Sequence, residues 1–341
     1  MIVDDSAVTR AILSRILSDD PDFEIVATAG DAHAALNALR STHVDIVLLD
    51  VALPGASGLE ALPDIVAAGR GARVLIVSSM AEEGAEVTVR ALAQGAADAL
   101  PKPAAAAFAG RFAAMLTDRL RRIGRADRLP GAGGGAGEAP VRLREMPSAP
   151  LCCLALGAST GGLPALLAFL RALPERIGVP ILVTQHLPAT FMAHFAGQLE
   201  AASGRSARVV GDGDKVLAEA IHVAPGNAHL TLVRDGLEVT VALDCRRAAS
   251  GCRPSVDPML TSVATAYGEN GLAVILSGMG RDGLLGAGRL VEAGGAVIVQ
   301  DRVSASVWGM PGSVARAGLA AAILSPADLA RRVAARASSC R

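Results

Sequence analysis

The sequence predicts an α/β protein of two domains, each a doubly wound parallel sheet with helices on both faces. With 341 residues, the chain is longer than one hydrophobic core usually serves. In both halves short apolar runs alternate with helical stretches, which is typical of a parallel sheet. Between the halves, residues 125–150 are rich in Gly and Pro and lack apolar periodicity. We therefore expect domains at 1–124 and 151–338, joined by a flexible linker at 125–150.

The elements follow from this alternation. In the first domain, helical stretches such as AVTRAILSRIL and HAALNALR separate strand candidates at 1–3, 46–50, 73–79 and 97–103. In the second domain, the stretch PALLAFLRAL predicts a helix, and the strand candidates are 151–157, 180–186, 220–226, 229–236, 272–278 and 295–301.

Composition excludes several classes of partner. Formal net charge is −1 and the basic residues are scattered, so we expect neither nucleic acid nor an anionic membrane surface as a partner. The five cysteines lack metal-ligand or CxxC spacing, and Cys152 and Cys153 are expected inside a strand core. No signal peptide and no run of about 18 apolar residues is found. The expectation is a reduced, cytoplasmic protein with no direct membrane insertion.

Carboxylates follow two strand candidates of the first domain. Asp4 and Asp5 come directly after the first, and Asp50 ends the run IVLLD. Strand ends of a parallel sheet gather in one crevice, where three carboxylates favour a hard divalent cation such as Mg²⁺. Two further strands end at Ser78 and Lys102. These side chains would contact a phosphoryl group attached to Asp50. Each residue alone is more often a helix cap or a turn residue, so the prediction depends on their order.

In that order the residues resemble the receiver domain of two-component response regulators, over about residues 1–124. The resemblance implies a flavodoxin-like fold with Asp50 as phospho-acceptor, contacted by Ser78 and Lys102. It also implies Mg²⁺ bound directly by Asp5, Asp50 and the Ala52 carbonyl, and through water by Asp4. Two features depart from the family: Ala99 occupies the usual aromatic switch position, and the first strand is short, which suggests a start codon further upstream.

The stretch LGASTGGL, residues 156–163, follows an apolar run and precedes a helical one. A phosphate-binding loop would continue with Lys and Ser or Thr, whereas Leu163 and Pro164 follow here. A dinucleotide fingerprint would need glycine in place of Ser159. The remaining interpretation is G-x-S-x-G from Gly157 to Gly161, a strand-turn-helix spacing that exposes a serine nucleophile, although such residues also fill ordinary turns.

A serine nucleophile needs a base and a group that orients the base. His186 ends the strand candidate PILVTQH, and Asp282 lies in the Gly-rich loop SGMGRDG after another strand candidate. The chain order Ser, His, Asp differs from that of α/β-hydrolases. Three other histidines are expected to be structural, namely His194, His222 and His229.

The segments GASTGG, QHLP, APGNAHL, RPSVD and SGMGRDG together resemble the catalytic domain of chemotaxis protein-glutamate methylesterases, the CheB family. The resemblance implies a Rossmann-like α/β domain without a cofactor, in which Ser159 is the nucleophile, His186 the general base and Asp282 its orienting acid. The backbone N–H of Met279, with a contribution near Thr160, is our candidate for the oxyanion hole. Arg253 and Asp257 would line the substrate groove or form a salt-bridged loop.

The implied substrates are glutamate γ-methyl esters on methyl-accepting chemotaxis receptors, and in relatives also receptor glutamine. A chemotaxis histidine kinase would supply the phosphoryl group, and the unphosphorylated receiver would cover the esterase site. Two alternatives stay open: a regulator that binds partners without catalysis, and an esterase or deamidase of a chemosensory array that controls something other than motility.

Overall fold

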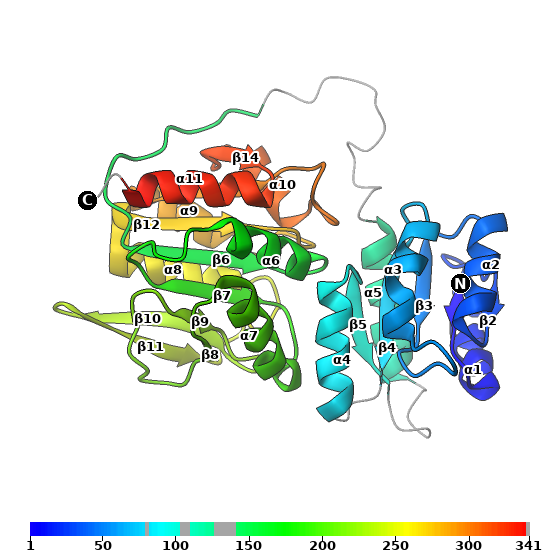
Figure 1. The fold of residues 1–341 in the computed structure, drawn as a ribbon. Coiled ribbons are helices and arrows are strands. Elements are labelled where there is room, and N and C mark those ends of the chain that lie inside the picture. The colour runs from blue at the N-terminus through cyan, green and yellow to red at the C-terminus, as the bar shows by residue number, and fades with distance from the viewer. Residues whose placement is uncertain (79–81, 103–109, 126–140, 339–341) are drawn as a thin grey trace. The chain divides into compact units, whose positions relative to one another are not determined.

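The computed structural model describes residues 1–78, 82–102, 110–125 and 141–338 (Figure 1). They belong to two compact units, within residues 1–135 and 136–341. Both units are α/β with a parallel sheet, which confirms the predicted fold class.

The first unit contains a five-stranded parallel sheet in the order β2-β1-β3-β4-β5. Its strands are β1 (Ile2–Val3), β2 (Thr28–Ala29), β3 (Ile46–Leu49), β4 (Arg73–Ser78) and β5 (Asp98–Pro101). Its helices are α1 (Ala7–Ser18), α2 (Ala32–Ser41), α3 (Gly58–Ala68), α4 (Glu82–Ala93) and α5 (Arg111–Arg125). The order reverses between β1 and β3, so the crevice at the carboxyl ends of these two strands is the expected place for a site.

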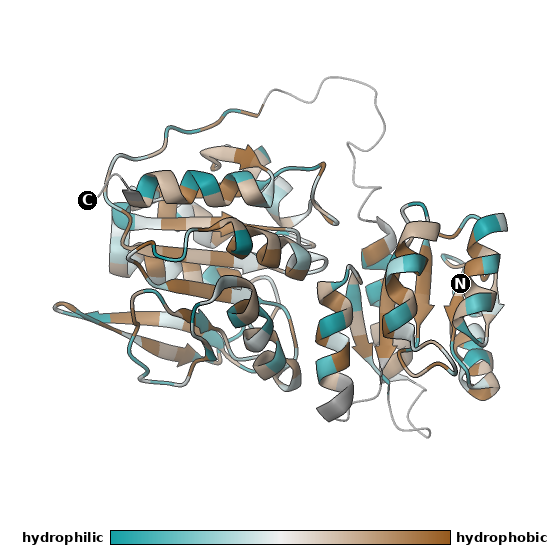
Figure 2. Ribbon diagram, in the orientation of Figure 1, coloured by the Kyte–Doolittle hydropathy of each residue, from teal (hydrophilic) through white to brown (hydrophobic). Residues whose placement is uncertain are grey.

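Helices cover both faces of this sheet. On one face α2 packs against α3, and α3 against α4 (Figure 1). On the other face α1 and α5 bury their apolar stripes with strand side chains in one cluster, which includes Leu13, Leu48, Leu75 and Leu116. Because neighbouring residues of a strand point to opposite faces, burial on both faces requires strands that are apolar at nearly every position. Figure 2 shows the strands as mostly hydrophobic and the helices as mixed.

The second unit contains a seven-stranded parallel sheet in the order β14-β13-β12-β6-β7-β9-β8. Its strands are β6 (Cys153–Ala158), β7 (Ile181–Gln185), β8 (Ala207–Val209), β9 (Ile221–Val223), β12 (Gly271–Ile275), β13 (Ala296–Gln300) and β14 (Ala322–Leu324). Six strands were predicted in this domain and five of them lie in this sheet, while β8 and β14 were not foreseen because they are short, partly exposed strands at the two edges of the sheet.

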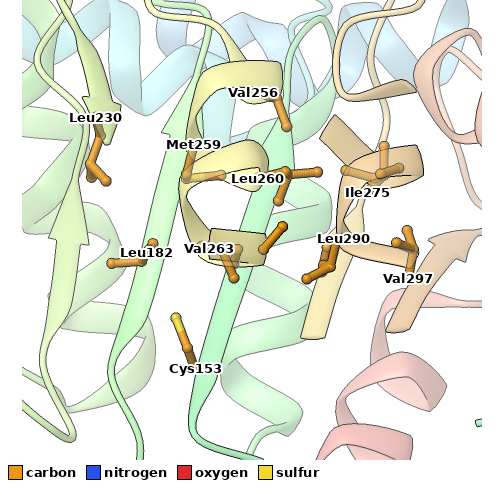
Figure 3. Packing of buried hydrophobic residues seen from close by; sticks show 14 of the residues in the cluster. Cys153, Leu182, Leu230, Val256, Met259, Leu260, Val263, Ile275, Leu290 and Val297 are labelled. Atoms are coloured by element: carbon orange, nitrogen blue, oxygen red, sulfur yellow. The ribbon is translucent and has the colours of Figure 1, made fainter. Parts of the chain in front are cut away.

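The helices of the second unit form two layers. They are α6 (Gly162–Ala172), α7 (Ala189–Ser203), α8 (Val256–Tyr267), α9 (Leu284–Glu292), α10 (Met310–Arg316) and α11 (Pro326–Ser338). On one face α6 packs between α7 and α11, and on the other α8 packs against α9 (Figure 1). Figure 3 shows how α8 lays Met259, Leu260 and Val263 over the central strands, where Cys153 and Ile275 contribute to the same cluster.

The remaining predicted strand, at 229–236, lies outside the parallel sheet. It is β10 (His229–Asp235), which pairs with β11 (Glu238–Asp244) in an antiparallel two-stranded hairpin. Gly236 has φ 58° in the two-residue turn between them. A glycine at the first position of a two-residue loop is a local hairpin signal, and Gly236 could have predicted β11 from the sequence. The hairpin packs on α8 and so helps to position the start of that helix.

Part of the predicted linker is attached to the second unit. Residues 126–140 lie outside the described residues. Residues 141–150 belong to the second unit and form no helix or strand. The Arg144 N–H donates to the Ala320 carbonyl at 2.9 Å, and the Asn270 side chain donates to the Pro150 carbonyl at 2.8 Å. In the described residues, no helix combines the length and apolar character that a membrane span requires.

Candidate catalytic and phosphoryl-acceptor sites

The turn that carries Ser159 starts directly after β6. The Ser159 N–H donates to the Ser277 carbonyl at 3.0 Å, and the Gly162 N–H donates back to the Ser159 carbonyl at 2.8 Å, which closes the turn before α6 begins. Gly161 has φ +65°, and a Cβ built on it would lie 2.4 Å from Ser306 Cβ. A side chain at this position would be strained and would clash, so glycine is required here. The turn holds the Ser159 hydroxyl at the carboxyl edge of the sheet.

His186 and Asp282 meet Ser159 at the same edge. His186 follows β7, the neighbour of β6, and its Nδ1 lies 2.8 Å from Ser159 Oγ. Its other ring nitrogen, Nε2, lies 2.7 Å from Asp282 Oδ2 in the loop between β12 and α9. The three residues predicted from the sequence as a group are therefore joined by two hydrogen bonds. With a proton on Nε2 donated to Asp282, Nδ1 is free to accept from the serine hydroxyl.

The beginning of α8 holds the Asp282 carboxylate. Ser255 Oγ donates to Oδ1 at 2.6 Å, the Val256 N–H donates to Oδ2 at 2.8 Å, and the Asp257 N–H donates to Oδ1 at 3.3 Å. These donors and the positive end of the helix dipole favour the ionised carboxylate. Although burial alone would raise the pKa of Asp282, its hydrogen bonds and the charge of His186 lower it below the usual value. The carboxylate is thus kept ionised and in one orientation.

His229 supports Ser255, which in turn holds the Asp282 carboxylate. His229 is buried, its Nδ1 accepts from the Ser255 N–H at 2.9 Å, and its Nε2 lies 2.8 Å from the Arg246 carbonyl.

His222 is also buried, and its Nε2 accepts from the Leu217 N–H. In the sequence the segment around Ser255 was interpreted as a groove or a salt-bridged loop. In the structure Asp257 is buried and accepts from the Gly286 N–H, and Arg253 is exposed.

Electrostatics at His186 involve one residue that the sequence did not single out. Burial alone would lower the pKa of His186, but the hydrogen bonds and charges of Asp282 and Cys252 raise it to about 9. The contact acts in both directions, because burial would raise the pKa of the Cys252 thiol whereas His186 lowers it. No sequence signal links Cys252 with His186, since they come from segments 66 residues apart and meet only in the fold.

Two backbone N–H groups belong to segments next to Ser159: Thr160 follows it in the chain, and Met279 follows Gly278, on which a Cβ would lie 3.0 Å from Ser159 Cβ. Within the described residues, neither the Thr160 N–H nor the Met279 N–H donates to an acceptor of the protein. Both segments are held in place, because Ser277 Oγ donates to the Thr160 carbonyl at 2.9 Å and the Met310 N–H donates to the Gly278 carbonyl at 2.8 Å. The donors are thereby fixed while their N–H groups remain available to a ligand.

The acidic pocket of the first unit lies where β1 and β3 end. Ligand oxygens of Asp4, Asp5 and Asp50 all lie within 4.8 Å of one another. Lys102, which follows β5, places its Nζ 2.7 Å from Asp4 Oδ2 and 2.5 Å from Asp50 Oδ2. Three carboxylates and one ammonium leave a formal charge of −2, and the donors are hard oxygens, so this set fits a divalent cation such as Mg²⁺.

Charges within this pocket depend on one another. Burial raises the pKa of Asp50, although Lys102 and the Ala52 N–H oppose the shift. Burial alone would lower the pKa of Lys102, but its hydrogen bonds to Asp4 and Asp50 raise it, so the ammonium stays charged at neutral pH. Ser78 ends β4, and its side chain is not among the described ones. Ala99 is buried in β5 at the position where the resemblance would place an aromatic residue.

One unit has an acidic pocket of the kind that accepts a phosphoryl group, and the other has a Ser-His-Asp arrangement. Together they define a response regulator whose output domain is a hydrolase. Comparison with protein families agrees with this class. Residues 1–108 match the response regulator receiver domain, and residues 154–333 match the CheB methylesterase. The chain belongs to the CheB methylesterase family, with a receiver domain at its N-terminus.

Curated relatives match along the whole chain. The protein-glutamate methylesterase/protein-glutamine glutaminase 2 of Caulobacter vibrioides is 40% identical over 343 residues, covering 99% of this chain and 99% of that protein. The corresponding protein 1 of Paramagnetospirillum magneticum is 37% identical and covers 97% of this chain and 93% of its own length. The crystal structure of the Thermotoga maritima CheB methylesterase catalytic domain is 33% identical with a TM-score of 0.53, and covers 55% of this chain and 99% of that domain.

Proposed function

We propose that this protein is a phosphorylation-activated protein-glutamate methylesterase that hydrolyses γ-methyl esters on methyl-accepting chemotaxis receptors. The observation that carries the proposal is the pair of hydrogen bonds, 2.8 and 2.7 Å, that join Ser159 to His186 and His186 to Asp282. The family membership and the names of the relatives support the choice of substrate.

In the first half of the reaction, Ser159 Oγ attacks the ester carbonyl carbon while His186 Nδ1 takes the hydroxyl proton. The Nε2 proton remains on the imidazole, because the Asp282 carboxylate stabilises the imidazolium without being protonated itself. Collapse of the tetrahedral intermediate breaks the bond to the methoxy group. His186 Nδ1 gives its proton to that oxygen, and methanol leaves an acyl-enzyme on Ser159.

The negative charge on the carbonyl oxygen of the intermediate needs donors that are already oriented. The N–H groups of Thr160 and Met279 supply them in this proposal. In the second half, water attacks the acyl-enzyme with the same base, and glutamate is released. A glutamine side chain follows the same course with ammonia as the leaving group, so deamidation belongs to the same proposal.

The first unit regulates this reaction through Asp50. The carboxylate oxygens of Asp4, Asp5 and Asp50, with the Ala52 carbonyl, would hold Mg²⁺, which when bound neutralises charge on a phosphoryl group at Asp50. Lys102, together with the Ser78 hydroxyl, contacts that group. Phosphorylation adds negative charge beside Lys102 and changes its partners, and a chemotaxis histidine kinase is the proposed donor.

The direct test is release of methanol from receptor-bearing membranes that carry labelled methyl groups, with and without acetyl phosphate and Mg²⁺. Release that rises with the phosphodonor is expected. Ser159→Ala should abolish release while the protein stays folded, and Asp50→Asn should keep basal release but lose the stimulation. Full stimulation of Asp50→Asn would refute the proposed acceptor, and continued release by Ser159→Ala would refute the nucleophile.

A further inference from the structure

Cys252 stands beside the catalytic histidine, although the proposed reaction does not use it. Its thiol, the imidazole of His186 and the carboxylate of Asp282 each offer a ligand atom, and these atoms lie within 4.8 Å of one another. Of the cysteines that the structure describes, all are free, and Cys252 is partly buried whereas Cys153 is fully buried. A thiol with some access to solvent can accept an incoming ion.

Sulfur, imidazole nitrogen and carboxylate oxygen form a donor set that suits Zn²⁺. Zinc bonds of about 2.0–2.3 Å place neighbouring ligand atoms about 3.3–3.7 Å apart in a tetrahedral site. The ion would therefore part His186 Nε2 from Asp282 Oδ2, now 2.7 Å apart, and draw the Cys252 thiol inward. A water molecule would complete four ligands.

The surroundings already orient two of the three ligands. Asp282 is held by the Ser255 hydroxyl and the Val256 N–H, as described above. His186 is held through its other ring nitrogen by Ser159 Oγ at 2.8 Å. Such outer contacts fix the orientation of metal ligands in known sites, and they raise affinity because less ordering is needed on binding.

We propose that His186, Cys252 and Asp282 form an inhibitory binding site for Zn²⁺ or a similar thiophilic divalent cation in the catalytic domain. Binding releases the thiol proton of Cys252 to solvent, and the ion takes the Nε2 lone pair of His186. A neutral imidazole has one N–H, which must then lie at Nδ1. Nδ1 can no longer accept the Ser159 proton, so the site loses its general base.

The test uses the full-length protein in excess Mg²⁺, which occupies the acidic pocket of the receiver, and the cobalt ion as a spectroscopic substitute for zinc. One equivalent of Co²⁺ should produce a near-ultraviolet thiolate-to-cobalt charge-transfer band. Cys252→Ala should lose the band, as should Cys252→Ser, which keeps the size of the side chain. Cys245→Ser removes an exposed thiol on the same segment and should keep it.

The inhibitory effect rests on the proposed function and has its own measurement. Zn²⁺ should stop methanol release by the unchanged protein, and Cys252→Ser should raise the half-inhibitory concentration at least about tenfold. A band that persists in both Cys252 variants would overturn the site. Equal inhibition of the Cys252→Ser and unchanged proteins would overturn it as well. If no receptor is demethylated at all, the cobalt spectrum still decides the site independently of the esterase proposal.

Discussion

Replacing Gly161 by alanine tests how strictly the turn positions the proposed nucleophile. Its φ of +65° disfavours an alanine by about 1–2 kcal/mol. The new Cβ would also lie 2.4 Å from Ser306 Cβ, where carbon atoms prefer about 3.5–4.0 Å. Relief of the clash requires a movement of about 1 Å and costs about 1–3 kcal/mol more. A displacement of that size at a reacting group lowers turnover by about 100-fold.

Gly204 provides a matched control for this change. It has φ +68°, but a Cβ on it would meet nothing within 4 Å. Gly204→Ala should therefore show the backbone strain alone and keep its turnover. Unfolding can be followed by the fluorescence of Trp308, the single tryptophan of the chain, which lies in the catalytic unit. Urea titration of both variants then compares their free energies of unfolding in this unit.

A second substitution separates the clash from the strain. Ser306→Gly removes the two nearest atoms that Gly161→Ala would meet, Cβ at 2.4 Å and Oγ at 2.8 Å, so the double variant should recover most of its turnover while it retains the loss of stability due to φ. Equal stability and full turnover in Gly161→Ala and Gly204→Ala would refute the reasoning. Failure of Ser306→Gly to restore any turnover would show that contact with Ser306 is not the cause.

Three further outcomes are expected. Ser255→Ala removes a buried hydrogen bond to the Asp282 carboxylate, which should lower the free energy of unfolding by about 1.5–3 kcal/mol and lower kcat. Ser262→Ala, about two turns further along α8, should do neither. An unchanged kcat in Ser255→Ala would contradict the positioning role. Burial raises the pKa of Asp257 to about 6, above its value in an unfolded chain. The folded protein therefore retains a proton that the unfolded chain loses, and the free energy of unfolding falls as pH rises toward 6. Asp257→Asn should flatten that part of a urea-denaturation profile against pH, and an unaltered profile would assign the slope to another group. Because the proposed base must be neutral and the pKa of His186 is raised to about 9, kcat/KM should rise with pH up to about 9 after subtraction of spontaneous ester hydrolysis, and a plateau already at pH 7 would contradict this.

Much of the fold could be predicted because periodic burial leaves a direct trace in the sequence. Central strands such as β6 and β12 are apolar at nearly every position, which follows from helices on both faces of the sheet. The edge strands β8 and β14 carry a weaker trace, since most of their three residues are not fully buried, whereas the equally short β9 is buried throughout. The hairpin of β10 and β11 was half predicted, and Gly236 at the first position of its two-residue loop was the signal overlooked.

The sequence by itself determined which residues form the two candidate sites and that these residues follow strands. Ser159, His186 and Asp282 all come after apolar runs, and the carboxyl ends of parallel strands must share one edge of the sheet. The same rule united Asp4, Asp5, Asp50 and Lys102.

Only the tertiary structure decided how those side chains are held and what else touches them. Ser255 and His229 support Asp282, and Cys252 contacts His186, through packing of α8 and the hairpin on the sheet. These contacts join segments that are tens of residues apart. Their register depends on loop conformations and helix packing, which local periodicity does not encode. Spacing can therefore predict the members of the proposed triad, whereas the residues that tune it become visible only when the chain is folded.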